Sequence, residues 1–329
     1  MRRRLPLALL AGGAAYVGAS WLLSRRVAQR LVSSRGLAPL RESREALVAA
    51  LSDAGAEVAD FRFEGAARAP VVLAAVFATP GAPSTRATIV FLHGKGGGAG
   101  EWRTDAVRAV GQGYNVLIPD LRGHPPSLGS FFTFGFLERE DMAVALARAA
   151  GRFHLDPSRL GVHSCSAGSS VALEWAAREP RIRAIWLESP FADARAMARR
   201  YLSRATGIPP ALLGLTTSFA IRRAVRTVRQ ALVLRGKGEG LEELDPIAAA
   251  AAIRAPICLV HGRRDDLIPP VFAARLADAL PPGSEIWRPA AAGHCHHDDE
   301  AQRVEREEYL RRWSGFFEEN LGKKERGKR

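Results

Sequence analysis

Hydrophobic and polar residues change their spacing repeatedly along this chain. From about residue 57 onward, short apolar runs alternate with longer stretches in which apolar residues recur every three or four positions. The short runs predict strands at Val71–Phe77, Thr88–Leu92, Tyr114–Pro119, Leu160–His163, Ile182–Leu187, Ile257–Val260 and Glu285–Trp287. The longer stretches predict helices at Asp105–Gly111, Glu138–Ala150, Ser169–Arg178, Val271–Leu280 and Glu300–Phe317. Repeated strand–helix alternation predicts an α/β fold, with a mostly parallel central sheet and helices on both of its faces.

Residues 194–244 interrupt this alternation, because they show a helical pattern and no strand. We interpret the segment as a helical lid inserted into the domain at 57–321. One predicted helix has an apolar face and a basic face, formed by Ile221, Val225, Val228 and Leu232 and by Arg222, Arg226 and Arg229. Such a helix suits either an anionic lipid surface or a lid whose arginines are simply hydrated.

The first 24 residues have the pattern of a membrane anchor. No charged residue occurs from Leu5 to Leu23, and arginines flank this run on both sides. A helix of 19 residues would be about 28 Å long at ~1.5 Å per residue, close to the ~30 Å hydrocarbon core. We therefore expect a protein anchored by a single N-terminal span, and the flanking arginines are compatible with a domain on either side of the membrane. A cleaved signal or a soluble helix is the alternative. Residues 25–56 are expected to form a helical connector.

The formal net charge of +13 is concentrated at the two ends of the chain. Residues 1–44 contain nine arginines and one acid, and the tail at 322–329 contains five bases and one acid, so the remainder is nearly neutral. A nucleic-acid-binding domain would carry a basic patch on its own fold. The distribution therefore argues against nucleic acid and favours membrane lipid as a partner.

The chain contains only three cysteines, Cys165, Cys258 and Cys295. An odd and sparse set is no disulfide framework. Any one pair could still form a bond, so the redox compartment stays open.

The segment around Ser166 has the pattern of a nucleophilic serine. An apolar run leads into Ser164-x-Ser166-x-Gly168, and a helix-forming run follows. A serine on a sharp strand-to-helix turn needs small residues two positions before and after it, because larger side chains would collide with neighbouring backbone. This segment resembles the nucleophile elbow of the α/β-hydrolase superfamily, in its esterase, lipase and serine-peptidase-like branch, although Ser164 replaces the usual glycine. Cys165 is a rival nucleophile, but a histidine occupies the position two residues before it.

Two later loops resemble those that carry the acid and the base in the same superfamily. The sequence HGRRDDLIP at 261–269 resembles the turn after a late strand and implies Asp265 as the acid, with Asp266 as the adjacent alternative. A noncatalytic helix cap is the other interpretation of this carboxylate. Ala-Gly-His at 292–294 implies His294 as the base. The order Ser166, Asp265, His294 is the chain order of the superfamily.

The glycine-rich loop after the strand at 88–92 resembles the loop that supplies an oxyanion-hole donor. The resemblance implies that the backbone N–H groups of Lys95 and Ala167 form this hole. His93 and Gly94 are then structural residues of the loop, as Ser164 and Gly168 are of the elbow.

The resemblance implies a serine hydrolase that cleaves small carboxylic esters through an acyl-enzyme and needs no cofactor. A thioesterase or a serine peptidase would use the same triad, and a noncatalytic binding protein is the alternative from another class. The run from His294 to Asp299, with His296 and His297, could bind a metal. No second ligand cluster supports it, so we expect no functional metal site.

Overall fold

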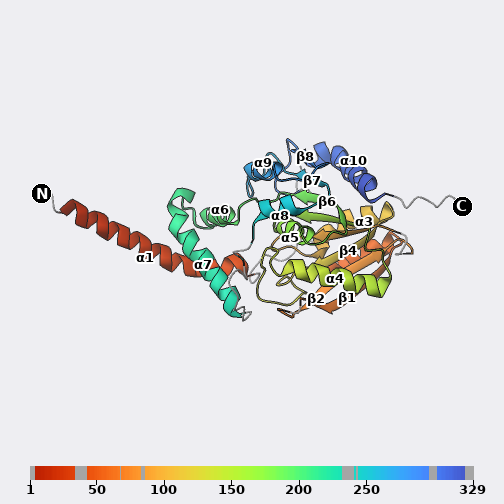
Figure 1. Ribbon diagram of the computed structural model, residues 1–329, viewed down its shortest axis with the longest axis horizontal. Helices are drawn as coiled ribbons and strands as arrows, with labels where there is room; N and C mark the ends of the chain where they lie inside the picture. The colour runs from red at the N-terminus through yellow and green to blue at the C-terminus, as the bar shows by residue number, and fades with distance from the viewer. Residues whose placement is uncertain are drawn as a thin grey trace.

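One central sheet organises the described part of the chain, in the strand order β1-β2-β4-β3-β5-β6-β7-β8 (Figure 1). The strands are β1 (Glu57–Glu64), β2 (Val72–Thr79), β3 (Thr88–Leu92), β4 (Asn115–Asp120), β5 (Leu160–Cys165), β6 (Ile182–Glu188), β7 (Ile257–Val260) and β8 (Glu285–Trp287). β2 pairs antiparallel with both β1 and β4, and all other pairs are parallel. The predicted fold class, a mostly parallel α/β-hydrolase sheet, is confirmed.

The computed structural model describes residues 4–33, 43–66, 68–82, 86–231, 241, 244–295 and 302–322, without the side chains of 4–10 and 302–304. Most of the basic tail, Leu232 and the run at 296–299 lie outside this part.

β1 is absent from the strands predicted from the sequence. In EVADFRFE only Phe61 and Phe63 are buried, and polar residues occupy most of the other positions. The strand lies at the edge of the sheet and buries one face, so its apolar content is low. A nearly continuous apolar run indicates a strand that is covered on both faces, so a strand with one buried face lacks this signal.

Two apolar layers cover the two faces of the sheet. Alternate residues of β2 enter different layers: Leu73 and Phe77 face one side, and Val76 and Ala78 face the other. The first layer includes α4 (Glu138–Phe153), α5 (Ala167–Ala176), α8 (Pro246–Ala252) and α9 (Val271–Ala277). The second includes α2 (Arg44–Asp53), the short η2 (Ala99–Trp102), α3 (Arg103–Gly111) and α10 (Gln302–Leu321). This alternation is the two-residue period of a pleated strand.

The N-terminal helix differs from the predicted anchor. α1 (Arg4–Val32) continues past residue 24 into the expected connector and includes Arg25, Arg26 and Arg30. Within the part of the chain that the structure describes, no helix combines the length and the apolar character that crossing a bilayer requires. The prediction of a membrane-anchored protein is therefore wrong.

The last turns of α1 pack against two helices that follow β6. These are α6 (Ala194–Thr206) and α7 (Gly214–Ala231), which a short 3-10 turn, η3 (Pro210–Leu213), connects. Val27, Ala28 and Val32 of α1 are buried together with Ala224 and Val228 of α7. Figure 1 shows α1 crossing α7 and extending away from the sheet. Of the apolar face predicted from the sequence, Val228 is thus covered by protein, and Ile221 and Val225 are partly buried.

A buried ion pair fixes the connection that follows β4. Arg122 donates from Nε to Asp141 Oδ2 at 2.6 Å and from Nη2 to Oδ1 at 2.7 Å, and both side chains are almost fully buried. The same carboxylate accepts the N–H of Ala66 at 2.9 Å. Removing one partner of such a pair leaves an uncompensated charge in the protein interior.

We expect Asp141→Ala to lower the free energy of unfolding by about 3–5 kcal/mol, because the guanidinium of Arg122 would stay buried without its carboxylate. Glu140→Ala is the matched control, since Glu140 forms an exposed pair with Arg68 and should cost no more than about 1 kcal/mol. Urea unfolding followed by circular dichroism measures both values. Similar losses in the two variants would contradict the expectation.

Candidate active site

The backbone turns sharply at Ser166, between β5 and α5. Ser166 has φ 55° and ψ −121°, a conformation that side-chain-bearing residues rarely adopt. Its N–H donates to the carbonyl of Glu188 at the end of β6, and its own carbonyl accepts the N–H of Ser169. The Cβ of a residue at 168 would lie 2.3 Å from the carbonyl oxygen of Leu92, so glycine is required there. Ser164 is fully buried beneath the turn, where its small side chain fits.

Three side chains that are distant in sequence form a continuous chain of hydrogen bonds. His294 Nε2 lies 3.0 Å from Ser166 Oγ, and His294 Nδ1 lies 2.9 Å from Asp265 Oδ2. The three residues follow β5, β7 and β8, whose carboxyl ends meet at one edge of the parallel sheet. The structure therefore brings together the serine, histidine and aspartate that the sequence pattern singled out.

Asp265 is held as a buried carboxylate. Its Oδ1 accepts the N–H groups of Leu267 at 3.0 Å and Ile268 at 2.7 Å. Burial by itself would raise the pKa of Asp265, but the hydrogen bond and charge of His294 and the N–H of Ile268 hold it below the ordinary value. Asp266, the adjacent alternative, points to solvent and pairs with Arg204 at 3.0 Å. Only Asp265 is placed to orient His294.

Two buried histidines shape the glycine-rich loop after β3. His93 Nε2 accepts the N–H of Leu121, and its Nδ1 donates to the carbonyl of Gly94 at 2.8 Å. His124 Nε2 accepts the N–H of Gly96 at 3.0 Å. Burial, aided by the proximity of His124, lowers the pKa of His93 to about 3, and burial lowers that of His124 to about 4. Both rings are neutral, as these acceptor roles require.

The loop lies directly beside the serine. The Cβ of a residue at 94 would stand 3.2 Å from the Cβ of Ser166, so Gly94 permits this close approach. Lys95 and Ala167 both line the cavity that Ser166 faces. Ala167 is the first residue of α5, where a backbone N–H has no acceptor within its own helix.

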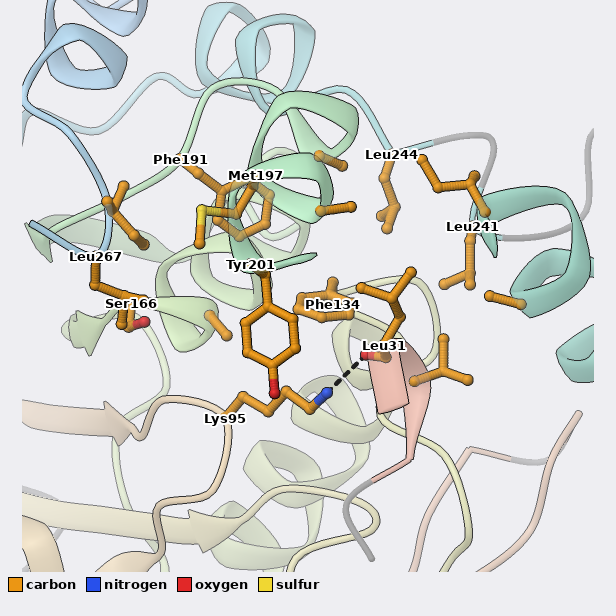
Figure 2. A pocket seen from close by; sticks show the side chains of 17 residues that line it. Leu31, Lys95, Phe134, Ser166, Phe191, Met197, Tyr201, Leu241, Leu244 and Leu267 are labelled. Atoms are coloured by element: carbon orange, nitrogen blue, oxygen red, sulfur yellow. Dashed lines mark hydrogen bonds between the residues drawn. The ribbon is translucent and has the colours of Figure 1, made fainter. Parts of the chain in front are cut away.

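An apolar cavity of about 230 Å³ opens at Ser166 (Figure 2). Its walls come from segments far apart in the chain. Helices contribute Leu31 and Val32 of α1, Met197 and Tyr201 of α6, and Ile221 of α7. Connecting segments contribute Phe134, Phe191, Leu241, Leu244, Leu267 and Ile268. The participation of α1 was not expected from the sequence, since packing between distant segments leaves no local pattern.

The side chain of Lys95 joins the glycine-rich loop to the end of α1. Its Nζ donates to the carbonyl oxygens of Arg30 at 2.5 Å and Leu31 at 2.7 Å, and Figure 2 draws the bond to Leu31. These carbonyls belong to the last turn of α1, where the helix dipole favours a cation. The rings of Phe134 and Tyr201 lie close by, with centroids 5.8 and 5.9 Å from Nζ. The side chain therefore lies against the cavity wall.

Cys165 and Cys295 form a disulfide, so the rival nucleophile at 165 is not a free thiol. The sequence left every pairing of the three cysteines open. Cys258 is the remaining one, free and buried in β7.

The described residues contain no group of three or more histidine, cysteine or acidic side chains that could hold a metal ion. His296 and His297 lie outside the described residues.

The position of Lys95 leads to a pH-dependent stability. Burial lowers its pKa to about 8, whereas an unfolded lysine titrates near ~10.4. Between these values the unfolded chain binds more protons, so stability rises with pH. Relative to Lys95→Met, we expect the wild type to gain on the order of 1–2 kcal/mol from pH 8 to 10, allowing for the partial exposure of this side chain. Urea unfolding of both proteins across this range measures the difference, and parallel stability curves would refute the prediction.

Sequence comparison connects this geometry to known proteins. The Alpha/beta hydrolase family matches residues 89–307, which is most of the chain. A protein of Bacillus subtilis strain 168, the uncharacterized protein YqkD, is 29% identical over 169 residues, which span 50% of this chain and 50% of that protein. The chain thus spans about half the length of this curated relative.

Solved structures share the fold at low sequence identity. The Pyrococcus furiosus esterase Pf2001 superposes with a TM-score of 0.63 at 22% identity, over 82% of this chain and 95% of the esterase. A puromycin-hydrolyzing peptidase of Mycobacterium tuberculosis gives 0.57 at 20% identity, over 83% of this chain and 40% of the peptidase. The match of the family over residues 89–307 shows that the chain belongs to the Alpha/beta hydrolase family.

Proposed function

We propose that this protein is a serine hydrolase that cleaves carboxylic esters of compact apolar acyl groups through an acyl-enzyme. The observation that carries the proposal is the hydrogen-bonded chain from Ser166 through His294 to Asp265, with spacings of 3.0 and 2.9 Å. A serine hydroxyl is a poor nucleophile at neutral pH and needs an adjacent base. His294 is at the distance that proton removal from Oγ requires.

In the proposed reaction, Ser166 Oγ attacks the acyl carbonyl while His294 Nε2 takes the hydroxyl proton. Asp265 keeps Nδ1 protonated and stabilises the imidazolium that forms. The N–H groups of Lys95 and Ala167 are proposed to bind the oxyanion. His294 then gives its proton to the leaving alcohol. A water next attacks the acyl carbonyl while His294 takes a proton from it. His294 returns this proton to Ser166 Oγ as the carboxylic acid leaves. No cofactor takes part in this scheme.

The apolar lining of the cavity favours an uncharged acyl group over a charged one. Apart from Ser166 and Lys95, its lining side chains are apolar except for the hydroxyl of Tyr201, and Lys95 already donates to two carbonyls of α1. A volume of about 230 Å³ lies below the ~300–1,000 Å³ of most ligand pockets, which favours short acyl groups. We propose that the segment at 194–244 acts as a lid, since α6 and α7 contribute cavity walls.

The same triad would serve a thioesterase or a peptidase, and a binding protein could retain it without turnover. The first two differ from an esterase in the leaving group alone, so the apolar cavity does not separate them. Matched ester, thioester and anilide substrates with a butyryl group do, through their kcat/KM values. A solved relative of this fold is named as an esterase and another as a peptidase.

We expect a fluorophosphonate probe to label the full-length protein, as Ser166 Oγ attacks phosphorus and fluoride leaves. Ser166→Ala should abolish labelling and lower p-nitrophenyl butyrate hydrolysis by at least about 10⁴-fold. Ser164→Ala is the control, because this nearby hydroxyl is buried below the turn and should be dispensable. Labelling that persists in Ser166→Ala would exclude the proposal, and folded wild type without labelling or turnover would favour the binding protein.

Gly262→Ala offers a test of the base without touching the triad. A Cβ at this position would lie 2.3 Å from the carbonyl oxygens of Ala292 and Gly293, so the loop that carries His294 must shift. A displacement near 1 Å costs roughly 100-fold in rate, so kcat should fall by about 10- to 100-fold with little change in KM. Gly315→Ala is the control, because its Cβ would meet no atom within 4 Å. An unchanged kcat in folded Gly262→Ala would count against His294 as the base.

A further inference from the structure

The disulfide joins the two residues that adjoin the proposed nucleophile and base. Cys165 is the last residue of β5 and directly precedes Ser166. Cys295 directly follows His294. The two Cα atoms are 6.0 Å apart, although 130 positions separate the residues in sequence. The bond therefore connects the turn that presents Oγ to the loop that presents the imidazole.

Both connected residues lie inside the protein. Each side chain is only 4% exposed, and both belong to the apolar layer that contains α10. A disulfide placed for resistance to unfolding alone has no reason to adjoin two catalytic groups. This one lies one residue from Ser166 on one side and one residue from His294 on the other.

The backbone beside the bond adopts, at Ser166 and at Cys295, a conformation that surrounding contacts must hold. Ser166 and Cys295 each have φ 55°, and Ser189, which contacts Cys295, has φ 45°. Residues other than glycine occupy this left-handed region at a cost, and they stay there only where surrounding contacts hold them. At Cys295 these contacts include the bond to Cys165, the hydrogen bond from its N–H to Ser189 Oγ at 3.1 Å, and packing in the apolar layer that contains α10.

The backbone hydrogen bonds of the loop that carries His294 lie on its N-terminal side. The N–H groups of Arg263 and Arg264 donate to the carbonyls of Pro289 and Ala292. The N–H groups of Ala290 and Ala291 donate to the carboxylate of Glu305 at 2.7 and 3.2 Å. Directly after His294, the covalent bond at Cys295 and the hydrogen bond to Ser189 restrain the loop.

We propose that Cys165 and Cys295 are positioning residues, whose disulfide holds His294 Nε2 within hydrogen-bonding distance of Ser166 Oγ. The inference rests on the proposed function, because it assigns the bond a role in that reaction. Neither sulfur touches the reacting atoms. The bond limits the displacement of the base loop from the nucleophile, and proton transfer depends steeply on that displacement.

Breaking the bond by reduction should release this restraint. Dithiothreitol supplies two electrons and two protons, so the S–S bond becomes two S–H groups and the reagent closes to its own cyclic disulfide. Because both cysteines are buried, reduction should be slow, and its progress can be measured as the appearance of free thiols. Turnover should fall in proportion to the thiols released, and reoxidation should restore it.

The main test compares Cys165→Ser, Cys295→Ser and the double variant in the full-length protein, at a temperature where circular dichroism shows all of them folded. We expect each single variant to lower kcat on p-nitrophenyl butyrate by roughly 10- to 100-fold with little change in KM. The double variant should lose no more than either single variant, because all three lack the same bond. Dithiothreitol should lower wild-type kcat to the level of the double variant and leave the double variant unchanged.

Cys258→Ala is the matched control, since Cys258 is a buried cysteine without a bond and should keep wild-type kcat. Single variants with wild-type kcat and only a lower melting temperature would overturn the inference, as the bond would then be structural. Losses that multiply in the double variant would also overturn it, because each cysteine would then act separately.

The proposed function has its own readout in the same experiment. Wild-type turnover that survives Ser166→Ala would refute the function whatever the cysteine variants do. In that event the ¹⁵N resonances of the His294 imidazole still report its position. Equal resonances in wild type and the double variant would overturn the positioning role independently.

Discussion

The left-handed backbone of Ser166 is the constraint around which the site is arranged. Ser166 lies between the last residue of β5 and the first residue of α5, and its backbone turns Oγ away from the sheet. Such a conformation persists only if several independent contacts oppose its relaxation. They are the hydrogen bond from its N–H to Glu188, the approach of Gly168 to the backbone of β3, and the covalent bond at the preceding residue.

Close backbone contacts, more than side-chain packing, set the distances between the loops of the site. Gly168 lies against Leu92 and His93, and Gly262 lies against Ala292 and Gly293, with no space for a Cβ at either glycine. Backbone atoms cannot rotate out of the way as a flexible side chain can. The glycines therefore bring the ends of separate parallel strands to the spacing that hydrogen bonding between Ser166 and His294 needs.

The sequence predicted those parts of the molecule that local patterns encode. The strands β3 to β7 are buried almost throughout, and the loops that carry Ser166 and Asp265 follow two of them, so both residues could be located from their neighbours in sequence. His294 was located from the Ala-Gly-His pattern before the last helix, since β8 is short and largely exposed. β1 was missed because an edge strand with two buried phenylalanines lacks an apolar run. The role of α1 was misjudged, since an uncharged stretch is compatible with more than one environment and its contacts with α7 arise only in the folded chain. The sequence did contain a signal for the disulfide, because Cys165 and Cys295 directly adjoin the predicted nucleophile and base. The reacting atoms of Ser166 and His294 lie 3.0 Å apart, which brings the adjacent cysteines into the same region of the fold.

The hydrogen bonds from Lys95 to the last carbonyls of α1 show that the part of the chain that forms the site begins before residue 57. Sequence patterns alone would place the boundary of the domain near residue 57, after a dispensable extension. Leu31 and Val32 form part of the cavity wall, so a boundary near residue 57 would remove part of the site. A chain cut at that point would keep all eight strands, Ser166, His294 and Asp265, yet its cavity would be open on one side and Lys95 would face water.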